Sequence, residues 1–314
     1  MESITNTFIK FCKEGNLIEA QQILLENPDI NISADNECAF CETCWFGHLE
    51  VAQWLLQVKP DIDISADNEY AFRNACFRCH LEVAQWLLQV KPDINISTNN
   101  DDTFRSACYN GHLEVAKWLL QVKPNIIISA NNNDIFGYTC VQGRLEVAKW
   151  LLQVKPDIDI SADNEYAFRN TCMRGNLEVA IWLLQVKPNI DISANDEYAF
   201  RNTCWFGRLE VAKWLLQVNP NIDISANNNA AFCIACYNGH LEVATWLQSL
   251  RPYLYVINYD DKGKYKDYYI RTKEEENWGK RKYLVWLSSN DSPIKNSLLY
   301  KLPNDVSRKI IEYV

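Results

Sequence analysis

The chain has 314 residues, 48% of them apolar, and a formal net charge of −9. No stretch approaches the roughly 18 uninterrupted apolar residues of a membrane-spanning helix, and the N-terminus lacks the basic start and apolar run of a signal peptide, so we expect no membrane association and a cytoplasmic location. Residues 251–314 hold 13 Lys and Arg against 9 Asp and Glu, which leaves 18 against 31 in residues 1–250. Residues 1–250 are therefore acidic enough to repel phosphates, which argues against nucleic acid as the main partner.

A unit of 32 residues recurs in eight copies between about residues 4 and 250. Each copy repeats a leucine, a proline and a cysteine in register, which is the sequence signature of a stacked repeat architecture. The recurring cysteines are Cys12, Cys44, Cys76, Cys108, Cys140, Cys172, Cys204 and Cys236. Packed helices lie roughly 8–10 Å apart, whereas the Cα atoms of a disulfide lie within about 7 Å, so we expect this ladder of thiols to be reduced and buried. Reduced thiols suit an intracellular chain.

The first copy differs from the others where an end of the stack should differ. Glu19 and Gln22 occupy the positions that Val51 and Trp54 occupy in the second copy. Polar residues suit these positions only if no repeat precedes them, so the first copy is predicted to be an N-terminal cap.

Residues 65–92 illustrate a typical copy. Apolar residues at helical spacing predict a short first helix around residues 71–76, and residues 81–90 predict a second helix. Pro92 ends the second helix because proline lacks an amide hydrogen and disfavours helix in the residue before it. Asn68 and its equivalents occupy a turn position, where Asn tolerates a left-handed backbone.

The predicted second helix is apolar over more than half of its circumference. Such a helix must be covered on several sides, and one helix pair is too small to cover it. We therefore expect Trp54, Trp86 and Trp118 to be buried between neighbouring copies. The predicted fold is all-α: a solenoid of stacked helix pairs with short turns and an irregular C-terminal cap.

The second helix and the turn before it resemble the ankyrin repeat. The match is carried by residues 111–120, GHLEVAKWLL, and by their equivalents in the other copies. The copies depart from the family in their opening residues and in carrying Asn68 at a turn usually made by glycine. This regular, Trp-rich form is similar to the ankyrin proteins that large DNA viruses of amoebae encode. The resemblance implies a viral, intracellular, non-catalytic protein that binds a protein partner on a concave face made by the first helices and turns.

Variation between copies is concentrated in two consecutive positions before the inter-helix turn, which we name slot one and slot two. By the family's geometry these slots face the concave surface, and their residue types are those enriched at interface hot spots. The alternative is that these side chains pack against adjacent first helices and contact no partner. The predicted partner-binding residues are Trp45, Phe46, Phe77, Arg78, Tyr109, Asn110, Met173, Arg174, Trp205, Phe206, Tyr237 and Asn238; the fifth copy has Val141 and Gln142 in these slots.

Three cysteines and a histidine early in the chain have a spacing that is found in metal sites. They are Cys38, Cys41, Cys44 and His48. Two of these residues occupy ordinary repeat positions, and steps of three residues drift around a helix, so we predict no metal site.

The CxxC pairs that begin at Cys76 and Cys233 each join one ladder cysteine to a chance neighbour, which argues against a redox role. The four histidines are expected to satisfy backbone groups near the turns. Carboxylates such as Glu114 recur at the start of the second helix, where they complement its dipole. Catalytic residues would be single rather than repeated, so we predict no enzyme and no cofactor.

The repeat breaks after Pro252. Residues 253–257 and 268–270 flank an Asp/Gly turn region at 260–264, which predicts a β-hairpin. Residues 280–287 echo the second helix, so residues 251–290 are predicted to form an irregular ninth repeat with a hairpin insertion.

Residues 291–314 are predicted to contain a C-terminal helix. Its pattern resembles the opening helix of an F-box and the motif that ends many poxvirus ankyrin proteins, which implies docking on a SKP1-type adaptor of ubiquitin ligases. The residues that carry this resemblance are Leu302, Pro303, Val306, Ile310 and Tyr313. The alternative is a helix that only caps the stack. The sequence thus predicts a monomeric protein-binding scaffold or, alternatively, a substrate receptor for a host ubiquitin ligase.

Overall fold

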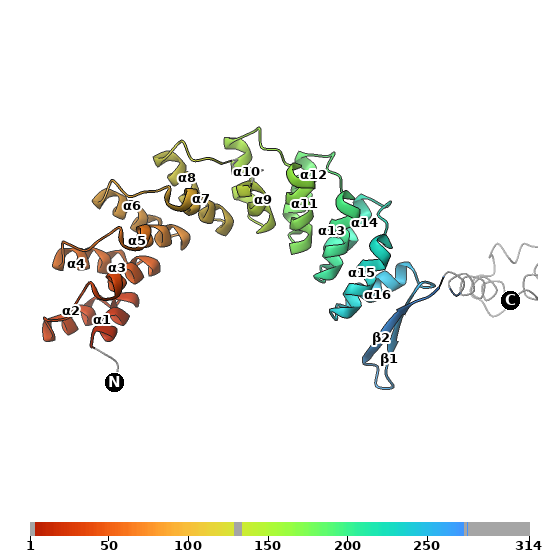
Figure 1. Cartoon of the computed structure of the whole chain (residues 1–314), viewed down its shortest axis with the longest axis horizontal. Coiled ribbons are helices and arrows are strands. Elements are labelled where there is room, and N and C mark those ends of the chain that lie inside the picture. Colours follow the sequence, from red (N-terminus) through yellow and green to blue (C-terminus); the bar gives the residue numbers. More distant parts are fainter. Residues whose placement is uncertain (1–3, 129–133, 273–274, 276–314) are drawn as a thin grey trace, which may run out of the picture. The chain divides into compact units, whose positions relative to one another are not determined.

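The computed structural model describes residues 4–128, 134–272 and 275. In these residues helices come in pairs, followed by a two-stranded antiparallel sheet (Figure 1). The helices are α1 (Ile4–Lys13), α2 (Leu17–Glu26), α3 (Ala34–Phe46), α4 (Leu49–Val58), α5 (Ala66–Phe77), α6 (Leu81–Val90), α7 (Thr98–Asn110), α8 (Leu113–Val122), α9 (Asp134–Val141), α10 (Leu145–Val154), α11 (Ala162–Arg174), α12 (Leu177–Val186), α13 (Ala194–Trp205), α14 (Leu209–Val218), α15 (Ala226–Tyr237) and α16 (Leu241–Leu250). The strands are β1 (Tyr255–Tyr259) and β2 (Tyr265–Ile270).

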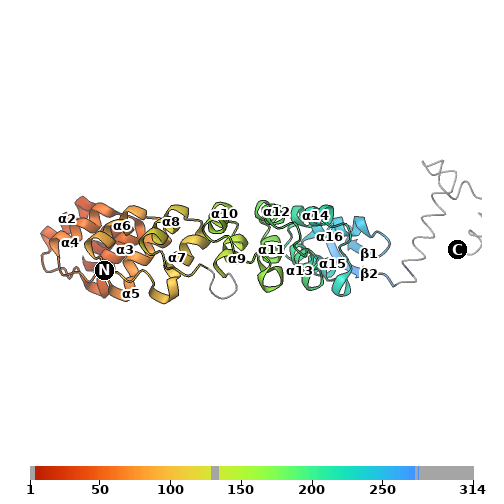
Figure 2. The same ribbon diagram turned by 90° about the horizontal axis from the view of Figure 1, so that it is seen from above.

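The chain divides into two compact units. One contains residues 1–171 and 178–188, and the other contains residues 172–177 and 189–314. Within each unit a first helix packs against its own second helix and against the first helix of the next pair, as α3 does with α4 and α5 and as α13 does with α14 and α15 (Figure 2). The predicted all-α stack of helix pairs is confirmed.

From the second pair on, the core of each pair is a phenylalanine from the first helix packed with a Val-Ala-Leu set from the second. Phe72, for example, is fully buried, and so are Ala84 and Leu87. The Phe72 ring also meets Trp118 of the following pair, with ring centroids 6.1 Å apart and planes tilted by 51°. The same contact joins Phe8 to Trp54, Phe40 to Trp86, Phe104 to Trp150, Phe136 to Trp182 and Phe200 to Trp246.

These tryptophans are half-buried rather than fully buried as the sequence analysis expected. One side of each ring covers the phenylalanine of the preceding pair, while the other side lies along the outer surface of the second helices. The ladder cysteines, in contrast, are buried and unpaired with one another, as expected.

The first residues of α3, α5, α11, α13 and α15 form a left-handed turn, which we name the tip. Asp67, Asn68 and Glu69 all have positive φ angles, of 51°, 55° and 62°. The sequence analysis expected this conformation only at Asn68, so the tip is longer than predicted. Its cost is about 1–2 kcal/mol per non-glycine residue, which other interactions of the tip must offset.

The two ends of the repeat region are capped differently. Glu19 and Gln22 of α2 are exposed, as predicted for a first copy. At the other end the predicted hairpin is confirmed, with Gly263 at φ 75° in its turn. Tyr255 of the hairpin stacks on the Phe232 ring with centroids 4.2 Å apart, where the other pairs use a tryptophan. The predictions for residues 280–290 and for the C-terminal helix lie outside the described residues.

Candidate protein-binding face

The two slots lie at the C-terminal ends of the first helices, where the chain turns into the second helix. Large exposed side chains gather there: the exposed fractions are 41% for Phe46, 45% for Trp205 and 85% for Tyr237. Phe77, Arg78, Arg174, Phe206 and Asn238 are also exposed, and Trp45, Tyr109, Asn110 and Met173 are half-buried. Val141 is buried at 4% exposure and belongs to the core.

Slot residues of the second and third pairs form one group together with Tyr70, which we name the N-terminal aromatic cluster: Trp45, Phe46, Tyr70, Phe77 and Arg78. The Trp45 ring lies parallel to Tyr70, with centroids 6.1 Å apart and an angle of 20°, and 6.2 Å from Phe77. The Arg78 guanidinium carbon lies 4.6 Å from the centre of the Trp45 ring. These side chains therefore pack against adjacent first helices, as the alternative reading supposed, and still expose part of their surface.

A second group is a row of tyrosines on α7, α9 and α11. The Tyr138 ring lies 5.4 Å from Tyr109 and 5.6 Å from Tyr166. Gly137 leaves room for this row, because a Cβ atom there would lie 3.2 Å from the Tyr166 ring. Sequence reasoning missed Tyr138 and Tyr166 because it considered only the two slots. The signal was present, since Tyr138 replaces an Asn found in three other copies, such as Asn74.

The second unit carries its own slot residues. The Trp205 and Phe206 rings lie nearly parallel with centroids 6.3 Å apart. Asn238 donates a hydrogen bond from Nδ2 to the Trp205 carbonyl oxygen at 3.2 Å, which ties the end of α15 to the end of α13. Tyr237 projects from α15 beside them.

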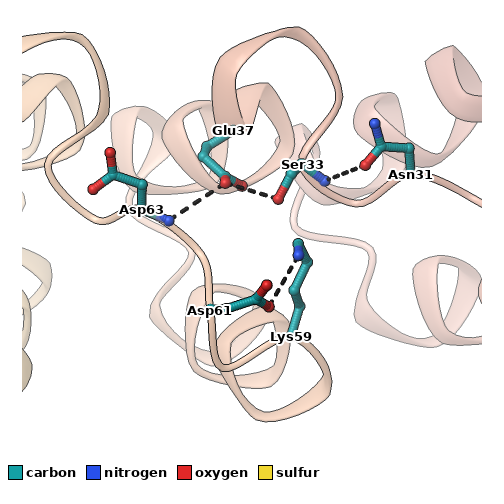
Figure 3. A network of polar contacts seen from close by, with 6 residues as sticks. All are labelled: Asn31, Ser33, Glu37, Lys59, Asp61 and Asp63. Carbon is teal, nitrogen blue, oxygen red and sulfur yellow. Dashed lines mark hydrogen bonds and ion pairs between the residues drawn. The ribbon is translucent and has the colours of Figure 1, made fainter.

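At α3 a buried carboxylate links the tip to the next repeat, as Figure 3 shows. Glu37 is only 8% exposed. It accepts a hydrogen bond from the Ser33 hydroxyl at 2.7 Å and another from the backbone N–H of Asp63 at 3.3 Å. The Ser33 N–H in turn donates to Asn31 Oδ1 at 3.2 Å. This network crosses from one repeat to the next, so it positions both the tip and the linker that follows.

The same contacts recur at other tips, which makes the network a property of the repeat. Ser65 and Asn95 bond Glu69, Ser161 bonds Glu165, Asp223 bonds Glu197, and Ser97 bonds Asp101. Sequence reasoning missed it. The signal was a Ser and a Glu four residues apart, which occur in register in four of the copies, as in SADNE at residues 65–69.

An arginine on three of the first helices holds the tip from the other side. Arg73 donates from Nε to the Asn68 carbonyl at 2.7 Å and from Nη2 to the Asp67 carbonyl at 3.2 Å. Arg169 and Arg201 make the equivalent bonds. A left-handed turn directs these carbonyl groups away from the helix, so they need other donors. These arginines are therefore structural.

Histidines occupy the position directly before several of the second helices and link consecutive repeats. His112 donates from Nε2 to the Phe77 carbonyl at 2.8 Å. The His48 ring lies over Gly15, where a Cβ atom would come within 2.5 Å of Nδ1. Burial lowers the pKa of His80, which also bonds the Trp45 carbonyl. The expectation that the histidines satisfy backbone groups is confirmed for His80 and His112.

The early cysteines do not have the chemistry of metal ligands. Burial raises the pKa of the Cys41 thiol to about 12 and that of Cys44 well above its ordinary value. A thiol binds a metal as the thiolate, which these environments disfavour. Within the described residues no group of three or more His, Cys, Asp or Glu side chains could hold a metal ion. Nor does any helix in the described ranges have the length and apolar character to cross a bilayer.

Stacked helix pairs joined by short turns define a helical repeat protein. Comparison with known proteins gives the same class: a family model described as three copies of ankyrin repeats matches residues 72–164 and 168–256, and another, of many copies, matches residues 37–88. The chain is similar to the ankyrin repeat domain of human ASB11, with 17% identity over 68% of this chain and 97% of that chain, and a TM-score of 0.49. No curated protein matches. The chain belongs to the ankyrin-repeat family, whose members are typically non-catalytic scaffolds for protein–protein interaction.

Proposed function

We propose that this chain is a non-catalytic scaffold that binds a protein partner through the slot residues at the ends of its first helices. The observation that carries the proposal is the contrast between a nearly constant framework and variable, exposed aromatic side chains in two positions of that framework. Exposed Trp, Tyr, Phe and Arg side chains on rigid helices are well suited to act as binding hot spots, because little conformational freedom is lost on binding.

The rigidity of the framework supports the same proposal. Buried carboxylates, arginines and histidines each link backbone groups of one repeat to the same repeat or the next, so the slots are held in place before a partner arrives. The free, buried thiols favour an intracellular location, and a viral source rests on the sequence resemblance alone.

The test is affinity capture followed by measured binding. The intact chain, and a Trp205→Ala/Phe206→Asp double variant, are used to capture proteins from host cytosol, and partners are identified by mass spectrometry and confirmed by titration. We expect the double variant to lose affinity for a partner while remaining within about 1 kcal/mol of wild-type stability, as surface substitutions do. Gln89→Ala, on the outer side of a second helix, is the matched control and should bind as the wild type does. Equal binding by all three proteins would refute the proposed face.

A second candidate function is a substrate receptor for a ubiquitin ligase. It rests on the resemblance of Leu302, Pro303, Val306, Ile310 and Tyr313 to a motif that docks on a SKP1-type adaptor. Capture with the full chain and with a chain lacking residues 295–314 tests it. An adaptor that co-purifies only with the full chain supports this role, and its absence from both captures refutes it.

A further inference from the structure

The Arg78 guanidinium lies over two rings of the N-terminal aromatic cluster. Its guanidinium carbon lies 4.6 Å from the centre of the Trp45 ring and 5.8 Å from that of Phe77. Such stacking restrains the guanidinium plane through cation–π attraction. A cation–π contact of this kind takes up no N–H donor of the guanidinium.

The edge of this guanidinium has no acceptor within the described part of the chain, although Arg78 is exposed. Two other arginines of the same unit differ in this respect: Arg73 donates to two tip carbonyls, and Arg144 donates from Nε to the Tyr109 carbonyl at 3.1 Å. The nearest cation on the cluster, Lys13, lies over Phe46 and pairs with Glu42 at 2.9 Å.

The backbone acceptors beside Arg78 are also occupied. The Phe77 carbonyl accepts a hydrogen bond from His112, and the Trp45 carbonyl accepts one from His80. The cluster therefore presents exposed aromatic surface and the N–H donors of one guanidinium group to a partner. The exposed fractions are 41% for Phe46 and 38% for Phe77.

We infer that Arg78 binds a carboxylate of the protein partner, on a segment that places an Asp or Glu side chain next to an apolar one. This inference rests on the proposed function. A guanidinium fork matches the two oxygens of a carboxylate, and the adjacent rings match an apolar side chain. Arg78 is the single arginine of the cluster, and one guanidinium suits a monoanion better than a phosphate dianion, which proteins usually bind with a cluster of arginines.

Arg174 is the matched comparison that the chain itself supplies. It occupies the same slot as Arg78 and is also exposed. The position equivalent to Trp45 in the preceding copy is Val141, so Arg174 has no aromatic ring in that register. We expect Arg174 to lack the orientation that makes Arg78 a specific carboxylate donor.

Peptide display on the full chain tests the inference. Libraries are selected against wild type, Arg78→Gln and Arg174→Gln. Wild type and Arg174→Gln should enrich peptides with Asp or Glu next to an aromatic or aliphatic residue, and Arg78→Gln should not. A selected peptide should then bind the wild type about tenfold more weakly when its carboxylate is replaced by an amide. The Arg78→Gln variant should bind the carboxylate and amide forms of the peptide with the same affinity. Arg78→Lys should recover only part of the affinity, because an ammonium group lacks the fork.

Two other outcomes overturn the inference. Peptides that bind wild type and Arg78→Gln equally, with no acidic preference, refute the carboxylate while leaving the proposed binding face intact. A phosphorylated version of the peptide that binds more tightly than the carboxylate form, in an Arg78-dependent way, would assign the fork to phosphate instead. Failure of the proposed function is distinguishable, because peptide and protein binding would then survive loss of the whole cluster in a Trp45→Ala/Phe77→Ala variant.

Discussion

Replacing the buried carboxylate of a tip should weaken the link between two repeats. Glu69 is 8% exposed and accepts hydrogen bonds from the Ser65 hydroxyl at 2.7 Å and from the Asn95 N–H at 3.2 Å. Hydrogen bonds to a charged group contribute about 1.5–3 kcal/mol each, so Glu69→Ala should cost about 3 kcal/mol. The left-handed strain at φ 62° is the same for Glu and Ala and cancels in this comparison.

A Glu69→Gly variant separates the two contributions. Glycine adopts a positive φ without penalty and should recover about 1–2 kcal/mol of the strain, partly offset by the greater freedom of its unfolded chain. Glu69→Gly is therefore expected to be more stable than Glu69→Ala but less stable than wild type. Gln89→Ala is the control, because Gln89 is exposed on α6, and it should change stability by about 0.5 kcal/mol or less.

The assays are urea unfolding followed by circular dichroism and hydrogen exchange of the Asn95 amide. Hydrogen exchange reports the link itself and does not require two-state unfolding, which long repeat arrays often violate. A loss of 1.4 kcal/mol corresponds to about tenfold faster exchange. An Asn95 amide as protected in Glu69→Ala as in wild type, together with unchanged urea unfolding, would show that the carboxylate does not join the repeats.

Three further predictions concern the core and the thiols. Trp118→Ala should cost about 2–3 kcal/mol in urea unfolding, below the 3–5 kcal/mol of a fully buried aromatic, because its ring is half-buried; a loss under 1 kcal/mol would contradict its packing role. Gly47→Ala should lower stability by at least about 1–2 kcal/mol, since Gly47 has φ 82° and a Cβ atom would overlap the His80 ring; a neutral result would contradict this. At pH 8 the exposed Cys79 should react with a thiol reagent well before the buried Cys41, and equal reaction rates would contradict the burial. Because the pKa of Cys41 is raised to about 12, its contribution to stability should be complete below about pH 9 and should be lost as the pH rises toward 12.

The sequence alone was sufficient to predict the helix pairs and their stacking. The reason is that these features depend on local patterns repeated eight times: apolar residues at helical spacing and a proline after each second helix. A repeat too small to bury its own apolar surface has to stack, so local pattern and tertiary arrangement follow from the same residues.

The tertiary structure decided what pattern could not show, namely which side chains of different repeats meet. Glu69 bonds a backbone N–H 26 residues away, and Tyr138 stands between tyrosines of two other helices. Slots that look alike in sequence differ in exposure, from buried Val141 to Tyr237 at 85%, because exposure depends on the neighbouring repeat as much as on the residue itself. Arg78 becomes a candidate carboxylate donor for the same reason: its own copy supplies the arginine, and the copy before it supplies the Trp45 ring.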